Sequence, residues 1–567
     1  MHYAELKRAH AVLTGPGGDF EIVEQEILGN RIRAYKNAPP SVREFWLSTL
    51  QFAENPYLIY QDEVLTYAQT HERTNAIVNW MFAQGVKPGD RVAVAMRNYP
   101  EWMIIYWACC SAGITIVGMN AWWTAEEMEY AIKDSEPKVL FLDVERLKRI
   151  EEKPGVADGI KLVGVRLPEP VDGVTPWDDV IATGGDLPDV KVDPDSDACI
   201  FYTSGTTGFP KGAQLTHRGC VSNLMNMLYA RVSSGLAVQL ATGEEPPVPD
   251  APPVGLITTP LFHVTANNCG VYAVTATGGA IALMYKWDPK EALRLIETHK
   301  VSAMSGVPVM AREILNHPDF EKTDTSSLQS LGGGGAQLPP DLVQKIDDKV
   351  SNARPNTGYG MTETCGIITS VSADFYVDRP DSVGPAMPNF EVKCVGPDDE
   401  EVAPGETGEL WVRGSSVIKG YINRPEATAE SITDGWLHTG DIARLDEDGF
   451  IYIVDRKKDM VLRGGENIYC AEVEAALYRH PAIAECSVFG VPDVRLGEEV
   501  AAAIVLKPGE SLTEEGLREH CLSIMAKHKV PRHIWMLEKP LPRNASGKFL
   551  KRELKAELSA QLDSAVS

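Results

Sequence analysis

From about Glu63 onward, short apolar runs alternate with stretches of helical periodicity, and this alternation constrains the fold more than any other feature of the sequence. Residues 91–96 and 138–142 are apolar runs of strand length, whereas residues 67–84 repeat their apolar side chains at helical spacing. Strands that alternate with helices of this length are typical of parallel βαβ units. The same pattern predicts a helix at 100–112, strands at 114–118, 255–260 and 280–285, and a helix at 289–299.

The pattern changes after about Asp378, where short strands separated by turns predict a more antiparallel, barrel-like segment at 392–395, 408–412 and 449–454. After Arg456 the sequence indicates a compact α+β unit with a helix at 472–480, strands at 484–489 and 499–506, and a helix at 513–527. We therefore predict an α/β fold. It has a large N-terminal domain of βαβ sheets plus the barrel-like segment (1–457) and a small α+β C-terminal domain (458–567).

Charge and cysteine content exclude several classes of protein. The formal net charge is −25, which argues against a bulk nucleic-acid binder but leaves room for a few cations around a small anionic substrate. Ten cysteines in 567 residues, with no CxxC pair, are too sparse for a disulfide scaffold, so we expect a reducing, cytoplasmic location. The N-terminus does not resemble a signal peptide. The most membrane-like run, 102–114, is shorter than the ~20 residues of a membrane span, so we expect a buried helix and no transmembrane segment.

Residues 201–212, Phe-Tyr-Thr-Ser-Gly-Thr-Thr-Gly-Phe-Pro-Lys-Gly, carry the strongest chemical signal. They follow an apolar stretch and precede a predicted helix near Thr216. The glycines allow backbone N–H groups to approach phosphate oxygens, three hydroxyls add donors, and Lys211 supplies a positive charge. The spacing differs from the GxxxxGK[ST] loop. The alternative is a Gly/Thr-rich surface loop, which this combination after a strand makes less favourable.

Five further segments, together with this loop, resemble the adenylate-forming (AMP-binding) superfamily of acyl-CoA synthetases, luciferases and nonribosomal peptide adenylation domains. They are Gly334-Gly335-Ala336, the YGMTET sequence at 359–364, and residues 436–441, 455–459 and 542–548. The resemblance spans roughly residues 45 to 555 and favours an acyl-CoA synthetase of the fatty-acid–CoA ligase type. It implies an AMP-forming acid–thiol ligase. A carboxylate attacks the α-phosphate of ATP to give acyl-adenylate and pyrophosphate, and a thiol then attacks the activated carbonyl.

The resemblance also implies a nucleotide site. It assigns contacts with ATP to Thr203, Ser204, Gly205, Thr206, Thr207, Gly208, Lys211, Gly334, Gly335, Ala336, Tyr359 and Gly360. Within YGMTET, Thr362 would bond the α-phosphate and Glu363 would hold Mg²⁺, while Asp441 and Arg456 would contact the ribose. Without the resemblance, Thr362 and Glu363 would be the start of a surface helix. Asp441 would be a turn aspartate, and Arg456 would be a linker arginine.

Three positions near and beyond the predicted domain boundary complete what the resemblance implies. Lys458 aligns with the family's hinge, about which the small, mobile domain rotates between the two half-reactions. Gly464 and Gly465 would line the pantetheine path, with a tight structural turn as the alternative. Lys548 would be the catalytic lysine that bridges the substrate carboxylate and the α-phosphate during adenylation; by itself it would be an ordinary exposed cation.

Residues 254–285 contain no Asp, Glu, Lys or Arg, so they form either plain core or core plus the wall of an apolar cavity. The resemblance places the acyl pocket here, with His263 gating it from the pantetheine side; otherwise His263 is a core histidine. No acidic residue is available to hold an amino group, which disfavours an amino-acid substrate. We predict an apolar carboxylic acid, preferably a medium- or long-chain fatty acid, with an aryl or polycyclic acid as the alternative.

The sequence leaves three functions open. The first is an acyl-CoA synthetase that uses ATP, Mg²⁺ and coenzyme A as a substrate. The second is an enzyme that stops at the acyl-adenylate or passes it to a carrier-protein thiol. The third is a non-catalytic ATP-binding or scaffold protein. The presence of Lys211, Glu363, Asp441 and Lys548 disfavours the third, and the absence of a carrier domain favours the first over the second. The expected partners are small molecules and not nucleic acid, with a homodimer left open.

Overall fold

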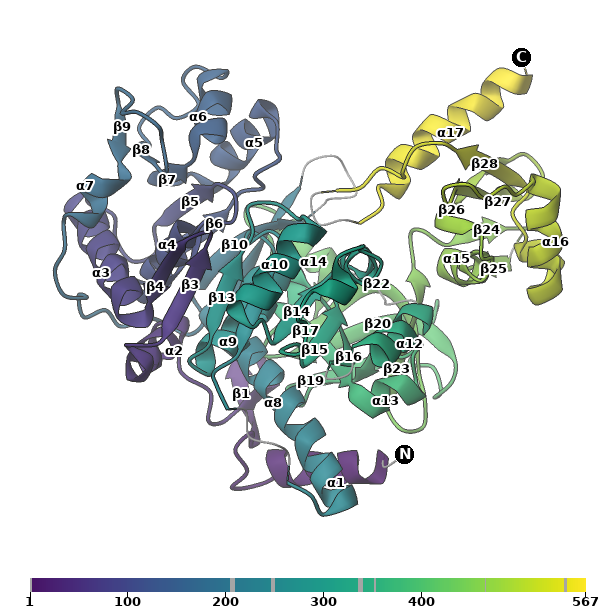
Figure 1. Cartoon of the computed structure of the whole chain (residues 1–567), viewed down its shortest axis with the longest axis horizontal. Coiled ribbons are helices and arrows are strands. Elements are labelled where there is room, and N and C mark those ends of the chain that lie inside the picture. The colour runs from purple at the N-terminus through teal and green to yellow at the C-terminus, as the bar shows by residue number, and fades with distance from the viewer. Residues whose placement is uncertain are drawn as a thin grey trace. The chain divides into compact units, whose positions relative to one another are not determined.

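The computed structural model describes residues 3–203, 210–245, 250–334, 340–350, 353–464, 466–544 and 548–566 (Figure 1). The chain divides into two compact units. The first comprises Met1–Glu391 and Val412–Leu437, and the second comprises Val392–Trp411 and His438–Ser567. Both units mix helices with sheets, which confirms the predicted α/β class.

A seven-stranded sheet in the first unit contains the strands predicted at 91–96, 114–118 and 138–142. Its strand order is β11-β10-β6-β5-β7-β8-β9, and only the edge pair β10–β11 is antiparallel. The bounds are β5 Arg91–Ala95, β6 Thr115–Gly118, β7 Val139–Leu142, β8 Lys161–Gly164, β9 Val174–Pro176, β10 Asp197–Thr203 and β11 Lys211–Thr216.

Helices cover both faces of this sheet (Figure 1). On one face lie α3 (Tyr67–Ala83) and α4 (Pro100–Ser111), where the ring of Phe141 from β7 meets Trp80 from α3. On the other face, α5 (Ala125–Ser135) and α6 (Val144–Glu151) bury their apolar side chains against β5, β6 and β7. Every residue of α4 is buried, which confirms the prediction of a buried helix, because a helix that is apolar all round cannot face water. None of the helices in the described part of the chain combines the length and the apolar character of a transmembrane span.

The second sheet of this unit has eight strands in the order β17-β16-β15-β14-β12-β13-β3-β4. The edge strands β4 and β17 are antiparallel to their neighbours, and the six strands between them are parallel. The bounds are β3 Pro56–Tyr60, β4 Glu63–Thr66, β12 Val254–Ile257, β13 Ala280–Leu283, β14 Ala303–Gly306, β15 Ser330–Gly333, β16 Arg354–Met361 and β17 Gly366–Ser372. The strands predicted at 255–260 and 280–285 are thereby confirmed.

Further helices complete the first unit, and the helix predicted at 289–299 is confirmed as α10. Their bounds are α1 Tyr3–Thr14, α2 Val42–Ser48, α7 Trp177–Ile181, α8 His217–Thr242, α9 Tyr272–Ala276, α10 Pro289–His299, α11 Pro308–Leu315, α12 Pro340–Lys349, α13 Ala373–Asp378 and α14 Pro425–Ser431. A separate antiparallel pair, β1 (Ile22–Ile27) and β2 (Asn30–Tyr35), follows α1.

The predicted barrel-like segment is a half-barrel sheet that includes the order β23-β22-β20-β19. Its strands are β19 Phe390–Val395, β20 Thr407–Gly414, β22 Trp436–Leu445 and β23 Phe450–Arg456. The short strands β18 (Gly384–Pro385) and β21 (Ile432–Thr433) lie in the same part of the sequence.

The second unit also contains a sheet in the order β25-β24-β27-β26, with β28 paired to β27. Helices α15 and α16 pack their apolar residues on one face of this sheet, and α17 packs on the other. The bounds are β24 Val461–Arg463, β25 Glu466–Ile468, α15 Cys470–Tyr478, β26 Ile483–Asp493, β27 Gly497–Leu506, α16 Glu514–Ile524, β28 His533–Leu537 and α17 Lys551–Val566. The predicted α+β elements are all present. All ten cysteines are free thiols.

Candidate active site

The proposed phosphate loop joins two antiparallel strands. Thr203 ends β10 and Lys211 begins β11, and the two residues are direct partners in the ladder. The Thr203 hydroxyl donates a hydrogen bond to the carbonyl of Lys211 at 3.4 Å. The predicted helix is α8, but β11 intervenes between the loop and this helix. Ser204, Gly205, Thr206, Thr207 and Gly208 lie outside the described residues.

Gly212 is required by the close packing of a distant segment against β11. A Cβ atom at this position would lie 2.7 Å from Cγ2 of Ile422 and 2.9 Å from Cγ2 of Ile200, closer than real side chains approach. The missing side chain allows the segment 417–422 to lie directly against β11. The N–H of Ile422 donates to the carbonyl of Gly212 at 2.9 Å, and the N–H of Gln214 donates to the carbonyl of Gly420 at 2.9 Å.

Glu363 is positioned by a tight turn between β16 and β17. Residues Thr362–Thr364 form a single 3₁₀ turn, and Cys365 follows in the left-handed region at φ 54°. Gly360 permits this close return of the chain, since a Cβ there would lie 1.9 Å from the carbonyl oxygen of Gly366. The turn leaves Glu363 only 7% exposed at the carboxyl end of a parallel strand, the edge at which open α/β sheets bind their ligands.

Lys211, Glu363 and Tyr421 form one cluster, although Lys211 and Tyr421 lie 210 positions apart in the chain. The Tyr421 hydroxyl donates to Oε1 of Glu363 at 2.9 Å, and Nζ of Lys211 lies 4.8 Å from the centre of the Tyr421 ring. The backbone holds the same three segments, because the N–H of Ile418 donates to the carbonyl of Glu363 at 3.0 Å. Burial and the neighbouring Glu363 both raise the pKa of Tyr421, so this phenol stays protonated and acts as a donor.

The carboxylate of Glu363 is a suitable ligand for a magnesium ion that also binds the phosphates of a nucleotide. Tyr421 bonds Oε1, and no described side chain donates to Oε2. Within the described ranges, no group of three or more His, Cys, Asp or Glu residues could hold a metal ion by itself. A single carboxylate is the arrangement expected where Mg²⁺ takes its remaining ligands from water and substrate phosphates.

Other predicted residues of the first unit lie along the same eight-stranded sheet. Tyr359 and Gly360 belong to β16, and the N–H of Gly334 donates to the carbonyl of Gly306 at the end of β14. His263 follows β12 and precedes a π-helix, Thr265–Val271; its ring is half-buried, with its centre 4.7 Å from that of Phe262. Gly335 and Ala336 lie outside the described residues.

Asp441 and Arg456 are direct partners across β22 and β23 in the second unit. Nε of Arg456 lies 3.4 Å from Oδ1 of Asp441, and the carboxylate is buried while the guanidinium is half-exposed. Lys458 lies in the turn after β23. Gly464 directly follows β24 with φ +59° and donates its N–H to the carbonyl of Leu496 at 2.8 Å. Gly465 lies outside the described residues.

Lys548 is exposed on the connection between β28 and α17. The N–H of Asn544 donates to the carbonyl of Lys548 at 2.8 Å, and the N–H of Lys548 donates to Oδ1 of Asn544 at 2.9 Å. Arg543 and Phe549 form an antiparallel bridge, and Arg543 pairs with Glu485 at 2.8 Å. The loop that carries Lys548 is therefore held at its base.

Asp455, which precedes Arg456, is buried and accepts hydrogen bonds from the N–H groups of Arg456, at 2.8 Å, and Cys470. A proline at position 470 could not donate the second of these bonds. Burial raises the pKa of Asp455 from 3.8 to about 6, against the opposing effect of the two N–H donors.

Because the pKa of Asp455 is raised, its contribution to the free energy of unfolding decreases as the pH rises. The folded protein holds the proton more tightly than the unfolded chain, so the free energy of unfolding falls as pH rises from about 4 to about 6. The expected loss is about 2–3 kcal/mol, and Asp455→Asn should abolish it. Melting temperatures of both proteins at each pH provide the measurement. A difference between the two proteins that stays constant from pH to pH would contradict the assignment.

Comparison with known proteins agrees with this geometry. The family model of the AMP-binding enzymes matches residues 45–422, and the model of their C-terminal domain matches residues 472–548. A feruloyl-CoA synthase from Amycolatopsis is 36% identical over 87% of this chain and 93% of its own. A long-chain-fatty-acid–CoA ligase from Bacillus subtilis is 33% identical over 90% of this chain and 93% of its own.

Solved structures give the same result. ATP-bound MatB from Rhodopseudomonas palustris superposes with a TM-score of 0.80 at 27% identity, covering 92% of this chain and 99% of that one. The o-succinylbenzoate-CoA synthetase MenE from Bacillus subtilis, in complex with ATP and magnesium, superposes with a TM-score of 0.74 at 29% identity, over 90% and 99% of the two chains. The chain therefore belongs to the AMP-binding enzyme family. Its relatives are CoA ligases and synthetases, which confirms the predicted class of AMP-forming acid–thiol ligase.

Tyr421 is a residue of the candidate site that the sequence did not predict. A tyrosine after a glycine, in a loop between short strands, is too common to indicate a role. Only the pairing of residues 417–422 with β11 brings this hydroxyl to Glu363.

Proposed function

We propose that the chain is an ATP- and Mg²⁺-dependent acyl-CoA synthetase that activates an apolar carboxylic acid, preferably a medium- or long-chain fatty acid. The acid attacks the α-phosphate of ATP and releases pyrophosphate, and the thiol of coenzyme A then attacks the acyl-adenylate and releases AMP. The observation that carries this proposal is the cluster of Lys211, Tyr421 and Glu363. It presents a cation and a magnesium-binding carboxylate at the mouth of the proposed phosphate loop, and in-line phosphoryl chemistry needs such positioning and charge neutralisation.

Within this proposal, residues 1–457 bind ATP and the acid, and residues 458–567 form the mobile lid domain. Thr362 bonds the α-phosphate, Asp441 and Arg456 contact the ribose, and Tyr359 stacks on adenine. Lys458 serves as the hinge. His263 gates the acyl pocket, and Gly464 lies along the pantetheine path. The relatives named above are CoA ligases, which favours coenzyme A over a carrier-protein thiol.

The preferred substrate rests on the uncharged sequence of residues 254–285, which builds β12, the π-helix, α9 and β13. Most of its side chains are buried, and none carries a charge that could pair with a polar substituent. An apolar acyl group is the chemistry that such a wall accommodates. The fatty-acid ligase among the relatives supports an aliphatic chain.

An aryl acid is the second candidate, because the feruloyl-CoA synthase is 36% identical to this chain. The test measures AMP release with ATP, coenzyme A and a panel of straight-chain fatty acids, benzoate, cinnamates and steroid acids. CoA-dependent AMP release with fatty acids supports the proposal, and a preference for cinnamates favours the second candidate. Transfer to a phosphopantetheinyl carrier alone would contradict coenzyme A as acceptor. A protein that exchanges no pyrophosphate with any acid would not be a synthetase.

Tyr421→Phe should weaken the apparent affinity for Mg²⁺ in the adenylation assay by about tenfold. The substitution keeps the ring beneath Lys211 but removes the donor to Glu363, and a hydrogen bond to a charged group contributes about 1.5–3 kcal/mol. Tyr452→Phe is the matched control, since Tyr452 donates to Asp446 at 3.1 Å in the second unit. An unchanged magnesium dependence in Tyr421→Phe would show that the hydroxyl does not position the carboxylate.

A further inference from the structure

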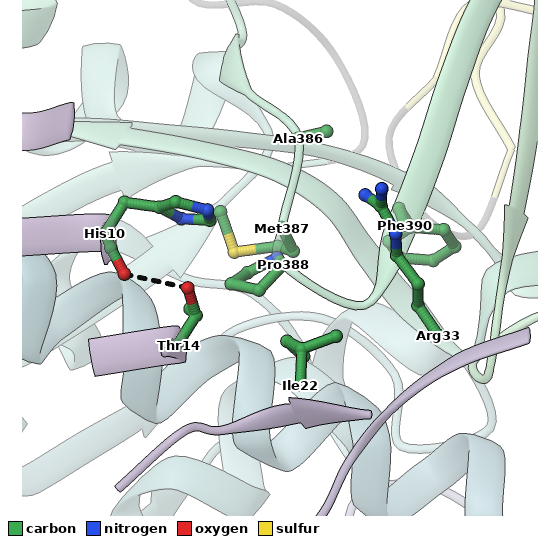
Figure 2. A pocket seen from close by; sticks show the side chains of 8 residues that line it. All are labelled: His10, Thr14, Ile22, Arg33, Ala386, Met387, Pro388 and Phe390. Carbon is green, nitrogen blue, oxygen red and sulfur yellow. Dashed lines mark hydrogen bonds between the residues drawn. The ribbon is translucent and has the colours of Figure 1, made fainter. Parts of the chain in front are cut away.

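A cavity of about 410 Å³ lies where α1, the β1–β2 pair and the segment before β19 meet in the first unit (Figure 2). It is lined by His10, Thr14, Ile22, Arg33, Ala386, Met387, Pro388 and Phe390. None of these residues belongs to the proposed active site. The volume lies within the range that binds small organic ligands.

The composition of the lining defines the chemistry that it can recognise. Five of the eight side chains are apolar, and Arg33 supplies the one permanent charge. In Figure 2, Met387 and Pro388 lie between the His10 ring and the Arg33 guanidinium. A single cation beside an apolar wall suits a monoanion with an apolar body, whereas a polyphosphate would need several cations.

Arg33 is available for such a ligand. It lies opposite Glu24 in the β1–β2 ladder, but that carboxylate pairs with Arg31 at 2.5 Å. Among the residues that the structure describes, no acidic side chain pairs with Arg33, and the side chain is exposed. Ile22 lies on the same face of the two-stranded ladder and supplies apolar surface beside the guanidinium.

His10 supplies a neutral polar group at the same cavity. The Tyr229 hydroxyl lies 2.8 Å from Nδ1 of His10, and Thr14 donates its hydroxyl proton to the His10 carbonyl at 2.8 Å. Burial, and then the positive charge of Arg33, lower the pKa of His10. An anion bound at Arg33 would cancel part of that charge, so His10 is a spectroscopic reporter of occupancy.

We propose that this cavity is a second, non-catalytic binding site for an amphipathic monocarboxylate, whose carboxylate pairs with Arg33 and whose apolar part contacts Ile22, Met387, Pro388 and Phe390. The ligand belongs to the same chemical class as the proposed substrate, but the site does not depend on the enzyme's activity. The N-terminal elements α1, β1 and β2 thereby acquire a role in ligand binding.

The test is co-crystallisation of the full chain with octanoate that carries bromine at its terminal carbon. Anomalous scattering should place one bromine in this cavity, separate from any bromine at the acyl site. Arg33→Ala should remove this peak and weaken binding at this site by about tenfold, as monitored by the His10 ring resonances. Lys36→Ala, which removes a cation that directly follows the same strand and pairs with Glu21 at 2.9 Å outside the cavity lining, should leave both unchanged.

Two control experiments test whether the carboxylate is needed for binding and whether the Arg33→Ala variant remains folded. The brominated octanol of the same length lacks the carboxylate and should not occupy the cavity. Pyrophosphate release by Arg33→Ala should match the wild type, which shows that the variant is folded and that the acyl site is intact. Bromine at the acyl site alone, or equal weakening by Lys36→Ala and Arg33→Ala, would overturn the proposal.

Discussion

Replacing Lys548 by alanine is expected to slow acyl-adenylate formation by about 10²–10³-fold, while thioester formation from supplied acyl-adenylate stays near the wild-type rate. In the proposed role, the ammonium group stabilises negative charge that develops between the carboxylate and the α-phosphate, and this charge is absent from the second half-reaction. Lys548 is exposed on a loop whose two ends are joined by hydrogen bonds between Asn544 and Lys548.

Pyrophosphate exchange measures the first half-reaction, and CoA consumption with purified acyl-adenylate measures the second. Lys539→Ala is the matched control, because Lys539 is an exposed lysine on the same connection between β28 and α17. It should leave both half-reactions unchanged. Equal loss of both half-reactions in Lys548→Ala would contradict the proposed role, and so would a comparable loss in Lys539→Ala.

Glu363→Gln is expected to lower the rate of pyrophosphate release by about 10²–10³-fold at moderate Mg²⁺ concentration, and to raise the Mg²⁺ concentration needed for half-maximal rate. The glutamine keeps the size of the side chain and an oxygen that can accept the bond from Tyr421. The variant therefore removes the negative charge without removing the 2.9 Å contact that holds the side chain. The loss should be largest at low Mg²⁺, because the charge acts through the metal ion.

A magnesium titration of the adenylation rate provides the measurement. Glu426→Gln is the matched control, since Glu426 is exposed in the neighbouring helix α14 and, within the described residues, forms no ion pair. The melting temperature of Glu363→Gln should stay close to that of the wild type. A fall in rate that is independent of Mg²⁺ would exclude Glu363 as the metal ligand.

The sequence was informative where local periodicity alone decides the structure. The predominantly apolar residues of α4 and the short apolar runs of β5 and β7 are recognisable from their own side chains, and all three elements form as predicted. The phosphate loop was harder to place. The sequence indicates the strand before the loop but not the strand β11 after it. β11 is stabilised by pairing with β10 and by hydrogen bonds to the distant segment 417–422.

The same distinction applies to the candidate site. Residues such as Lys211, Glu363 and Lys548 were identified from motifs, because their chemistry is confined to a few neighbouring positions. Tyr421 carries no such signal, and its role depends on one hydroxyl that lies 2.9 Å from a carboxylate 58 positions away. The cavity beside Arg33 is equally absent from the sequence pattern, since three separate segments line it.

Local patterns in the amino-acid sequence were sufficient to predict the alternation of strands and helices, the class of enzyme and most of the residues that are proposed to bind ATP. Periodicity and short motifs are local, and local preferences act before the chain has folded. The folded structure was needed to show that Gly212 allows the approach of Ile422 and that Tyr421 holds Glu363. It was also needed to show that Arg31 pairs with Glu24 while Arg33 faces a cavity. These outcomes depend on distances between remote segments, which side-chain contacts and backbone pairing establish only in the folded protein.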